Sequence, residues 1–170
     1  LAEAGITSFK IEGRLKNESY VRNVVRDYSI ALDELVARCP ETYERGSYGQ
    51  VSGGFTPDTA KTFNRGYTEL YIDGKRGKWA SMDAAKSMGE EIGQVVSLNK
   101  DKSSFGLKLV RKDIVLNNGD GFSFVGKDSS VNGFRGDVCS GNSIRCKSTP
   151  SLYVGAKIFR NINIAFEKEI

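Results

Sequence analysis

The sequence predicts an α+β protein in which one strand–helix unit precedes a small antiparallel β-barrel. Residues 7–13 alternate polar and apolar side chains, and the next twenty or so residues repeat apolar side chains at helical spacing. After residue 89, short apolar-alternating runs are separated by turn residues. We therefore expect three parts: a strand–helix unit at 1–39, a connector with short elements at 40–88, and the small β-barrel domain at 89–170.

The strand and helix of the first part follow from local pattern. Phe9 and Ile11 lie between polar residues, which predicts a strand that ends at Gly13. Asn17 is a candidate N-cap, and Glu18 is spaced to pair with an arginine four residues later. The helix is expected to end near the proline at position 40, and its apolar positions are Val21, Val24, Val25, Tyr28, Leu32 and Leu35.

The rest of the chain contains first a connector with little hydrophobic periodicity and then runs in which apolar and polar residues alternate. The connector has proline, repeated glycine and serine, and few apolar runs, although 67–72 is a candidate strand. Good turn residues lie between the later apolar runs. The predicted barrel strands are 92–98, 105–110, 121–125, 136–139, 143–146 and 153–160.

Composition excludes several classes of protein. The 170 residues are 39% hydrophobic without a run long enough to span a membrane, so we expect a soluble protein with no membrane partner. The chain has no histidine, which excludes Ser-His-Asp and Cys-His catalysis within it, and its net charge of +4 does not diagnose a nucleic-acid partner. Three cysteines favour a reducing cytoplasm. The sequence does not begin with an initiator methionine, and its first residues do not resemble a signal peptide. We therefore expect an internal piece of a larger protein.

The first candidate for chemistry is the charged segment Lys10, Glu12 and Arg14. If Phe9 and Ile11 face a helix, Lys10 and Glu12 face the other way at the C-terminal end of a strand. Functional groups of α/β barrels lie at this position. The alternative is an ion pair that only fixes the end of the strand.

Two further candidates lie in the connector. Asn64 and Arg65 are flanked by aromatic residues and glycine, so they could hold a phosphate or carboxylate, or simply form a turn. A basic and aromatic cluster follows, which could contact an RNA backbone and stack on a base, although such runs are more often solvated loops. Its members are Lys75, Arg76, Lys78 and Trp79.

The cysteines do not predict a metal site. Cys139 and Cys146 lack the close spacing of zinc or cluster ligands, and Cys39 is far from both. We interpret Cys139 and Cys146 as buried strand thiols and expect no cofactor within this segment.

Several of these residues together resemble a known family. Residues 8–14, then Tyr20 with Val21, residues 28–33 and the segment 64–66 are similar to the collagenase-like peptidases of unassigned catalytic type, family thirty-two. The resemblance is firmest over the first third of the chain. The barrel also resembles the second-domain barrels of translation factors, which dock RNA or a neighbouring domain.

The family resemblance implies that the first 38 or so residues are the last strand–helix remnant of an α/β barrel-like catalytic domain. Lys10, Glu12 and Arg14 match the family's strand motif, so the resemblance marks them as candidate catalytic residues. Relatives include collagenase-like proteases and enzymes that hydroxylate RNA bases or the ubiquinone ring with cysteine-held iron–sulfur clusters. A cluster is thus implied for the full-length parent, in segments other than this one.

The expected function is that of a C-terminal accessory fragment of a collagenase-like peptidase. It would be inactive alone, would have the parent's N-terminal catalytic domain as its partner, and would dock an RNA or protein substrate on the barrel. One alternative is part of an RNA-base hydroxylating enzyme of the same family. The other is a purely structural or protein-binding barrel module.

Overall fold

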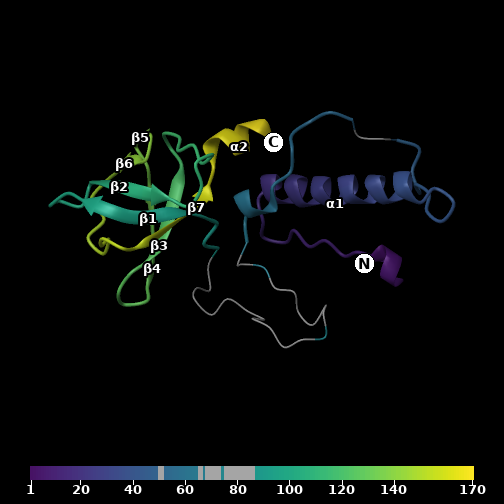
Figure 1. Ribbon diagram of the computed structural model, residues 1–170, viewed down its shortest axis with the longest axis horizontal. Coiled ribbons are helices and arrows are strands. Elements are labelled where there is room, and N and C mark those ends of the chain that lie inside the picture. Colours follow the sequence, from purple (N-terminus) through teal and green to yellow (C-terminus); the bar gives the residue numbers. More distant parts are fainter. Residues whose placement is uncertain (50–51, 65–66, 68–73, 75–86) are drawn as a thin grey trace. The chain divides into compact units, whose positions relative to one another are not determined.

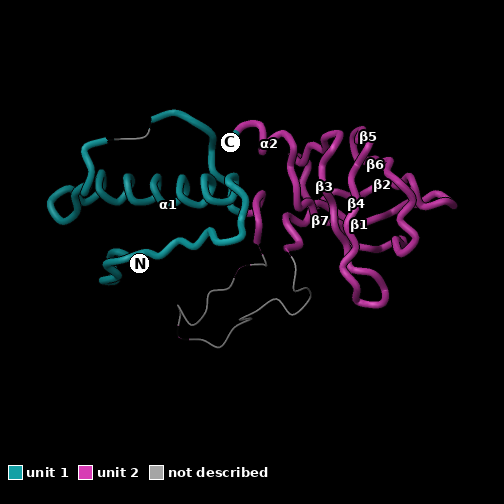
Figure 2. The backbone as a smooth tube through the Cα atoms, turned by 180° about the vertical axis from the view of Figure 1, so that it is seen from behind, with its two compact units in different colours: residues 1–59, 170 teal, residues 60–169 magenta. Residues whose placement is uncertain are grey.

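The computed structural model describes residues 1–49, 52–64, 67, 74 and 87–170 (Figure 1). The chain forms two compact units (Figure 2), Leu1–Thr59 with Ile170, and Ala60–Glu169. The three-part division predicted from the sequence stays a prediction, and the candidate strand at 67–72 falls almost wholly outside the described residues.

The N-terminal unit is built around one long helix, α1, Glu18–Arg38. The side chain of Asn17 accepts a hydrogen bond from the Tyr20 backbone N–H at 3.1 Å, which confirms the predicted N-cap. Glu18 and Arg22 form the predicted i,i+4 ion pair, 2.5 Å apart. A short 3₁₀ helix, Ala2–Ala4, precedes this region.

The strand predicted at 7–13 is not formed. Residues 6–13 run as an extended segment beneath α1, between the 3₁₀ helix and the turn before α1 (Figure 1). A strand requires a hydrogen-bonded neighbour, and no backbone hydrogen bond joins residues 7–12 to another described segment. The local pattern was therefore sufficient for an extended conformation but not for a sheet.

A buried asparagine fixes the chain that follows α1. Asn23 is fully buried, and its side-chain amide donates to the Asp58 carbonyl at 2.7 Å while its carbonyl accepts from the Asp58 N–H at 2.9 Å. The guanidinium of Arg26 donates to the Gly53 carbonyl. These contacts tie residues 53–58 to the helix through polar groups, where few apolar side chains are available.

The C-terminal unit is a curled antiparallel half-barrel of seven strands in the order β4-β3-β7-β1-β2-β6-β5 (Figure 1). All strand pairs are antiparallel. The sheet is not closed by pairing of its edge strands, β4 and β5. Its strands are β1 Glu90–Leu98, β2 Ser104–Leu109, β3 Gly121–Val125, β4 Val131–Arg135, β5 Val138–Ser140, β6 Ser143–Arg145 and β7 Lys157–Ile162.

The half-barrel encloses one continuous apolar core. Inward side chains alternate with outward ones along β2, where Phe105 and Leu107 both face the core. The Phe134 ring lies 5.5 Å from that of Phe105 and 5.4 Å from that of Phe122. The buried core consists of Ile92, Val95, Phe105, Leu107, Ile114, Leu116, Phe122, Phe124, Ile144, Cys146, Leu152, Ala156 and Ile158.

Each predicted barrel strand overlaps an observed one, and the main differences from the prediction are at β4, at the start of β7 and at the C-terminus. Strand β4 was not predicted, because Asn132 and Gly133 have low strand propensity and its pairing with β3 overrides that preference. Strand β7 begins four residues later than predicted, after a turn in which Gly155 has a φ of 96°. A short helix, α2, Ile164–Glu169, was also missed, and its buried Phe166 packs it onto the unit.

Candidate functional site

The extended segment before α1 carries the first group of predicted site residues. Phe9 and Ile11 line a groove beside α1, and the ring of Phe9 lies 6.3 Å from that of Tyr28. Lys10 and Glu12 form a 2.5 Å ion pair, with side chains that are 82% and 69% exposed. The predicted alternation is thus present. In this chain the two charges make an exposed ion pair, which contributes less than about 1 kcal/mol to stability.

Arg14 lies in the turn that leads into α1. Gly13 precedes it, and a Cβ added to Gly13 would lie 2.6 Å from a methyl group of Val21, so the close approach to the helix favours glycine. Leu15 follows with a φ of 60° and a side chain that is 94% exposed. Lys10, Glu12 and Arg14 are therefore all solvent-exposed, and their catalytic role stays a prediction.

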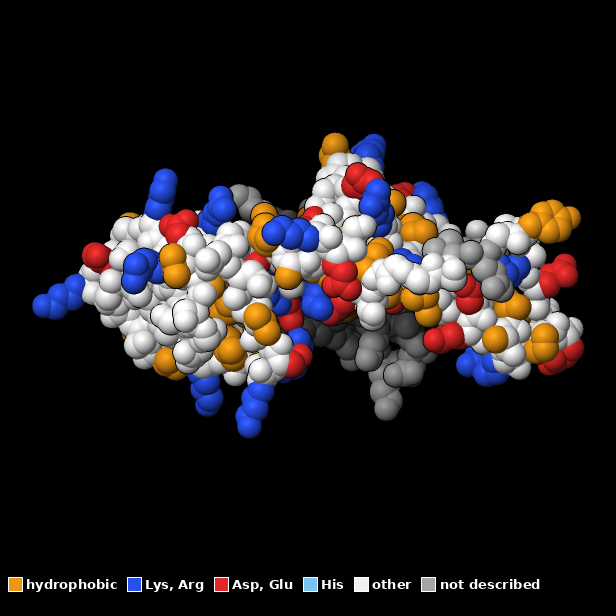
Figure 3. Space-filling model, turned by 90° about the horizontal axis from the view of Figure 1, so that it is seen from above, with side chains coloured by type: hydrophobic (Ala, Val, Ile, Leu, Met, Phe, Trp, Pro, Cys, Tyr) orange, Lys and Arg blue, Asp and Glu red, His pale blue; other side chains and the backbone are white. Residues whose placement is uncertain are grey.

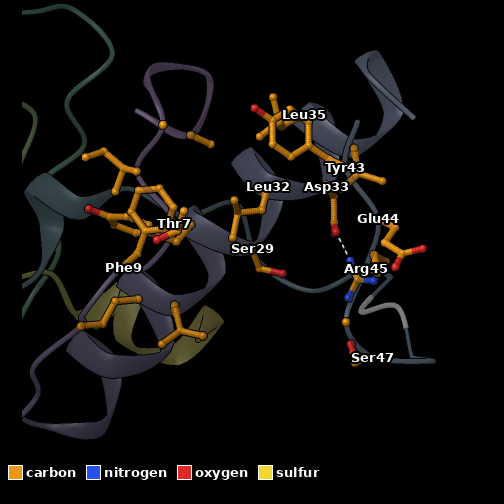
Figure 4. Close-up of a pocket in the computed structure, with 18 residues that line it drawn as sticks. Thr7, Phe9, Ser29, Leu32, Asp33, Leu35, Tyr43, Glu44, Arg45 and Ser47 are labelled. Atoms are coloured by element: carbon orange, nitrogen blue, oxygen red, sulfur yellow. Dashed lines mark hydrogen bonds and ion pairs between the residues drawn. The ribbon is translucent and has the colours of Figure 1, made fainter. Parts of the chain in front are cut away.

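An apolar groove of about 810 Å³ lies between the extended segment, α1 and the loop at 43–47 (Figure 4). We call it the α1 groove. Its helix wall is apolar and only partly buried. Leu35 is buried, whereas Val25, Tyr28 and Leu32 are 40–47% exposed. The apolar side chains around it are Ile6, Phe9, Ile11, Val25, Tyr28, Leu32, Leu35 and Val36.

One end of the α1 groove is polar. Asp33 of α1 and Arg45 of the following loop form an ion pair, drawn as a dashed line in Figure 4. Arg45 also donates to the Gly49 carbonyl at 2.8 Å. These bonds hold the loop against the helix. This pair was not predictable from the sequence, because Arg45 lies twelve residues after Asp33, in a connector without periodicity.

Asn64 is the one connector candidate that the structure describes. Its side-chain amide donates to the carbonyls of Ala60 and Thr62 at 3.1 and 3.2 Å, and its backbone N–H donates to the Ser87 hydroxyl. The choice between a turn and an anion site at 64–66 stays a prediction, because Arg65 and Gly66 lie outside the described residues. The other candidates, Arg65, Lys75, Arg76, Lys78 and Trp79, lie outside the described residues.

A buried charge cluster lies within the half-barrel. Arg160 of β7 is 4% exposed and pairs with Glu90 of β1 at 2.8 Å and with Asp120 at 3.3 Å. It also donates to the Val115 carbonyl at 2.7 Å. Asp120 is fully buried and accepts from the Ile164 N–H at the start of α2. The cluster therefore joins β1, β7 and α2, and its bonds pair the buried charges, although the Arg160 Nε has no hydrogen-bond partner among the described residues.

The pairing of Asp120 with Arg160 was not predicted from the sequence. Arg160 and Glu90 are seventy residues apart and directly opposite each other in the β1–β7 register. Only the strand pairing places them together. A small polar pocket of about 220 Å³ lies beside the cluster, with Arg111 at its rim bonded to Glu90 at 2.8 Å.

The cysteines are separate thiols. Cys39, Cys139 and Cys146 are free, and Cys146 is buried as expected, whereas Cys139 is half-buried. Burial raises the pKa of the Cys139 thiol to about 11, which disfavours the thiolate that binds metals. Among the described residues, no group of three or more Cys, Asp or Glu side chains is placed to hold a metal ion. The cysteines present thus do not fit an iron–sulfur cluster.

The two units define an α+β protein in which a helical unit with an open apolar groove precedes an antiparallel half-barrel. Residues 1–81 match the family model of peptidase family U32. This finding confirms the family resemblance inferred from residues 8–14. None of the helices in the described parts of the chain has the length and apolar character needed to span a bilayer.

Curated relatives carry two different names. The chain is 37% identical over 143 residues to a "23S rRNA 5-hydroxycytidine C2501 synthase" of Escherichia coli (strain K12). This alignment covers 81% of this chain and 20% of the relative. It is 38% identical over 80 residues to a "Collagenase" of Porphyromonas gingivalis, which covers 46% of this chain and 20% of that protein. The chain thus spans about a fifth of the length of these relatives. No solved structure matches it.

Proposed function

We propose that this chain is an accessory region of a larger U32 enzyme that modifies RNA, and that its half-barrel holds the RNA. The extent of the sequence matches carries this proposal. The match to the rRNA-modifying relative is 143 residues long, so it necessarily continues beyond residue 81 into the half-barrel. The match to the collagenase is 80 residues long. The longer match, which reaches into the half-barrel, therefore favours RNA over protein as the substrate.

The N-terminal unit would complete the catalytic domain of this enzyme. Residues 7–12 are extended without a ladder partner among the described residues, and the α1 groove beside them exposes Val25, Tyr28 and Leu32. A strand–helix unit of an α/β barrel needs a parallel strand on each side and apolar cover on the helix. We infer that other strands of the enzyme pair with residues 7–12 and that its other helices cover the groove.

In that assembly the charged segment would lie at the C-terminal end of the last barrel strand. Functional groups of α/β barrels lie at this end, and Lys10, Glu12 and Arg14 would line one edge of the site. The cysteines of this chain do not fit an iron–sulfur cluster, so no step of the reaction is assigned through one here. A cluster and a cytoplasmic location stay predictions about the whole enzyme.

Nucleoside mass spectrometry tests the proposal. Total RNA from cells with and without the full-length gene would be digested and compared, and we expect a hydroxylated pyrimidine to disappear without the gene. Restoring the gene with Glu12→Gln should leave the modification strongly reduced. The matched control is Glu18→Gln, which removes another exposed carboxylate near the start of α1 and should restore it fully.

Two outcomes would contradict these statements. Unchanged RNA in cells without the gene would remove RNA modification as the function. Full modification with Glu12→Gln would retain the function but remove Glu12 from the site.

Peptide hydrolysis is the second candidate, because the chain is similar over 80 residues to a protein named collagenase. Incubation of the purified full-length enzyme with gelatin would test it. Cleavage that is lost with Glu12→Gln, in cells whose RNA is unchanged, would favour the peptidase.

A further inference from the structure

A second groove, of about 650 Å³, lies on the half-barrel where β2 ends. We call it the β2 groove. One wall is the end of β2 with the loop that follows it, and the other is the turn between β5 and β6 at Gly141 and Asn142. Asn142 fixes this turn, because its side chain donates to the Leu107 carbonyl at 2.8 Å. The groove residues are Leu107, Lys108, Leu109, Val110, Arg111, Lys112, Ile114, Gly141 and Asn142.

The charged side chains that line the β2 groove are basic. Among the described residues they are Lys108, Arg111 and Lys112. Arg111 forms ion pairs with Glu90 and Asp113. The nearby carboxylates, Asp113 more than Glu90, raise the pKa of its guanidinium. Lys108 and Lys112 are exposed and form no ion pair with any described residue. Two cations are therefore available to a ligand.

The outer face of the sheet adds one further lysine, Lys157, which pairs with Glu91 at 3.2 Å. Lys108 lies opposite Gln94 on β1, and Gln94 lies opposite Lys157 on β7, so the three form one row across adjacent strands. Two residues earlier on β2, Gly106 lies between Ser97 and Ser143, where small side chains keep the sheet surface flat. Figure 3 shows Lys and Arg side chains projecting from the half-barrel, at the left of the view, with fewer acidic ones between them.

We propose that the β2 groove and this row bind the phosphate backbone of single-stranded RNA, an inference that rests on the proposed RNA function. Lysine ammonium groups bind phosphates without reading sequence. A peptide substrate fits less well, because the peptide would be expected to add to a free strand edge, whereas β2 lies between β1 and β6. No aromatic side chain lines the groove, so its contribution is charge rather than base stacking.

Fluorescence anisotropy with a short fluorescein-labelled single-stranded RNA tests the assignment on the 170-residue chain. The variant is the double substitution Lys108→Gln with Lys112→Gln. We expect roughly tenfold weaker binding at moderate salt and a salt slope lower by about 1.4, since each lost phosphate contact removes about 0.7 on a single strand. The conservative pair Lys108→Arg with Lys112→Arg should retain binding.

The matched control removes two exposed lysines from hairpin turns, Lys100→Gln with Lys127→Gln, and should change binding less than twofold because neither residue lines the β2 groove. Equal weakening by the control would mean that net charge, not this groove, binds RNA. Unchanged binding in the groove variant would overturn the groove assignment but leave RNA docking and the nucleoside result intact. Binding of a labelled gelatin peptide in place of RNA would overturn the choice of RNA.

Discussion

The two units differ in how they bury apolar side chains. Helix α1 buries only Asn23 and Leu35, and it leaves Val25, Tyr28 and Leu32 substantially exposed. The half-barrel encloses a continuous core in which Phe124 and several other residues have no exposed surface. A sheet that curls on itself can cover its own apolar face, whereas a single amphipathic helix requires a second layer. The half-barrel therefore covers its own apolar side chains, whereas the N-terminal unit leaves part of its apolar helix face exposed.

The largest effect is expected from Phe124→Ala in the half-barrel core. Truncation of a fully buried phenylalanine leaves a cavity, so the unit should lose about 3–5 kcal/mol of unfolding free energy. Urea unfolding, monitored through hydrogen exchange of the β3 amides, would measure the loss of unfolding free energy. Val115→Ala, at a side chain that is 69% exposed, is the control and should change little. A small loss with Phe124→Ala would mean that the half-barrel core is not independently packed.

Removal of the buried cation should have a similar or slightly smaller effect. Arg160→Ala leaves the carboxylates of Glu90 and Asp120 buried without their partner, which costs about 3–5 kcal/mol. Arg160→Lys keeps the charge but cannot make all three bonds, so it should fall between. Thermal unfolding of the three proteins would rank them. Equal stability of the Ala variant and the parent sequence would show that the cluster does not hold the strands together.

A moderate effect is expected from Asn23→Ala in the N-terminal unit. This variant leaves the Asp58 N–H and carbonyl without their buried partner, at a cost of about 1–3 kcal/mol. Faster exchange of the Asp58 amide and faster proteolysis at 53–58 would report it. Asn17→Ala, at the exposed N-cap of the same helix, is the control and should leave the Asp58 amide protected. Unaltered exchange in the Asn23 variant would mean that other contacts hold this segment.

The smallest effect in this chain should come from Leu32→Ser on the α1 groove. Its side chain is 41% exposed, so unfolding free energy should change by about 0.5 kcal/mol or less. In the full-length enzyme the same substitution should reduce solubility and activity, because we propose that the groove is covered there. An equally small effect in both proteins would contradict that proposal and remove the distinction between the two units.

Helix α1 and most strands were predictable because their signals are local. Asn17, the apolar spacing and the residues around position 40 specify the helix, and turn residues separate the later strands. Strand β4 was not predictable, since Gly133 and Asn132 take an extended ladder only beside β3. The strand expected at 7–13 was wrong for the opposite reason, because a correct local pattern has no described neighbour with which to pair.

The candidate sites divide in the same way. The alternation that turns Lys10 and Glu12 away from α1 was visible in the sequence, and so was the family that residues 8–14 resemble. The α1 groove was not visible in the sequence. An ion pair attaches its loop to the helix, and that loop belongs to a connector without periodicity. The β2 groove was also missed, since Gly141 lies about thirty residues after Lys108.

The sequence by itself determined the elements whose preference is set within a few residues: the capped helix α1, the alternating strands and the turns between them. Only the tertiary structure decided which strands are neighbours, how far the sheet curls, and that Arg160 meets both Glu90 and Asp120. The physical reason is range. Helical spacing and capping are local interactions, whereas strand pairing and buried charge compensation depend on residues that are distant in sequence and adjacent only after folding.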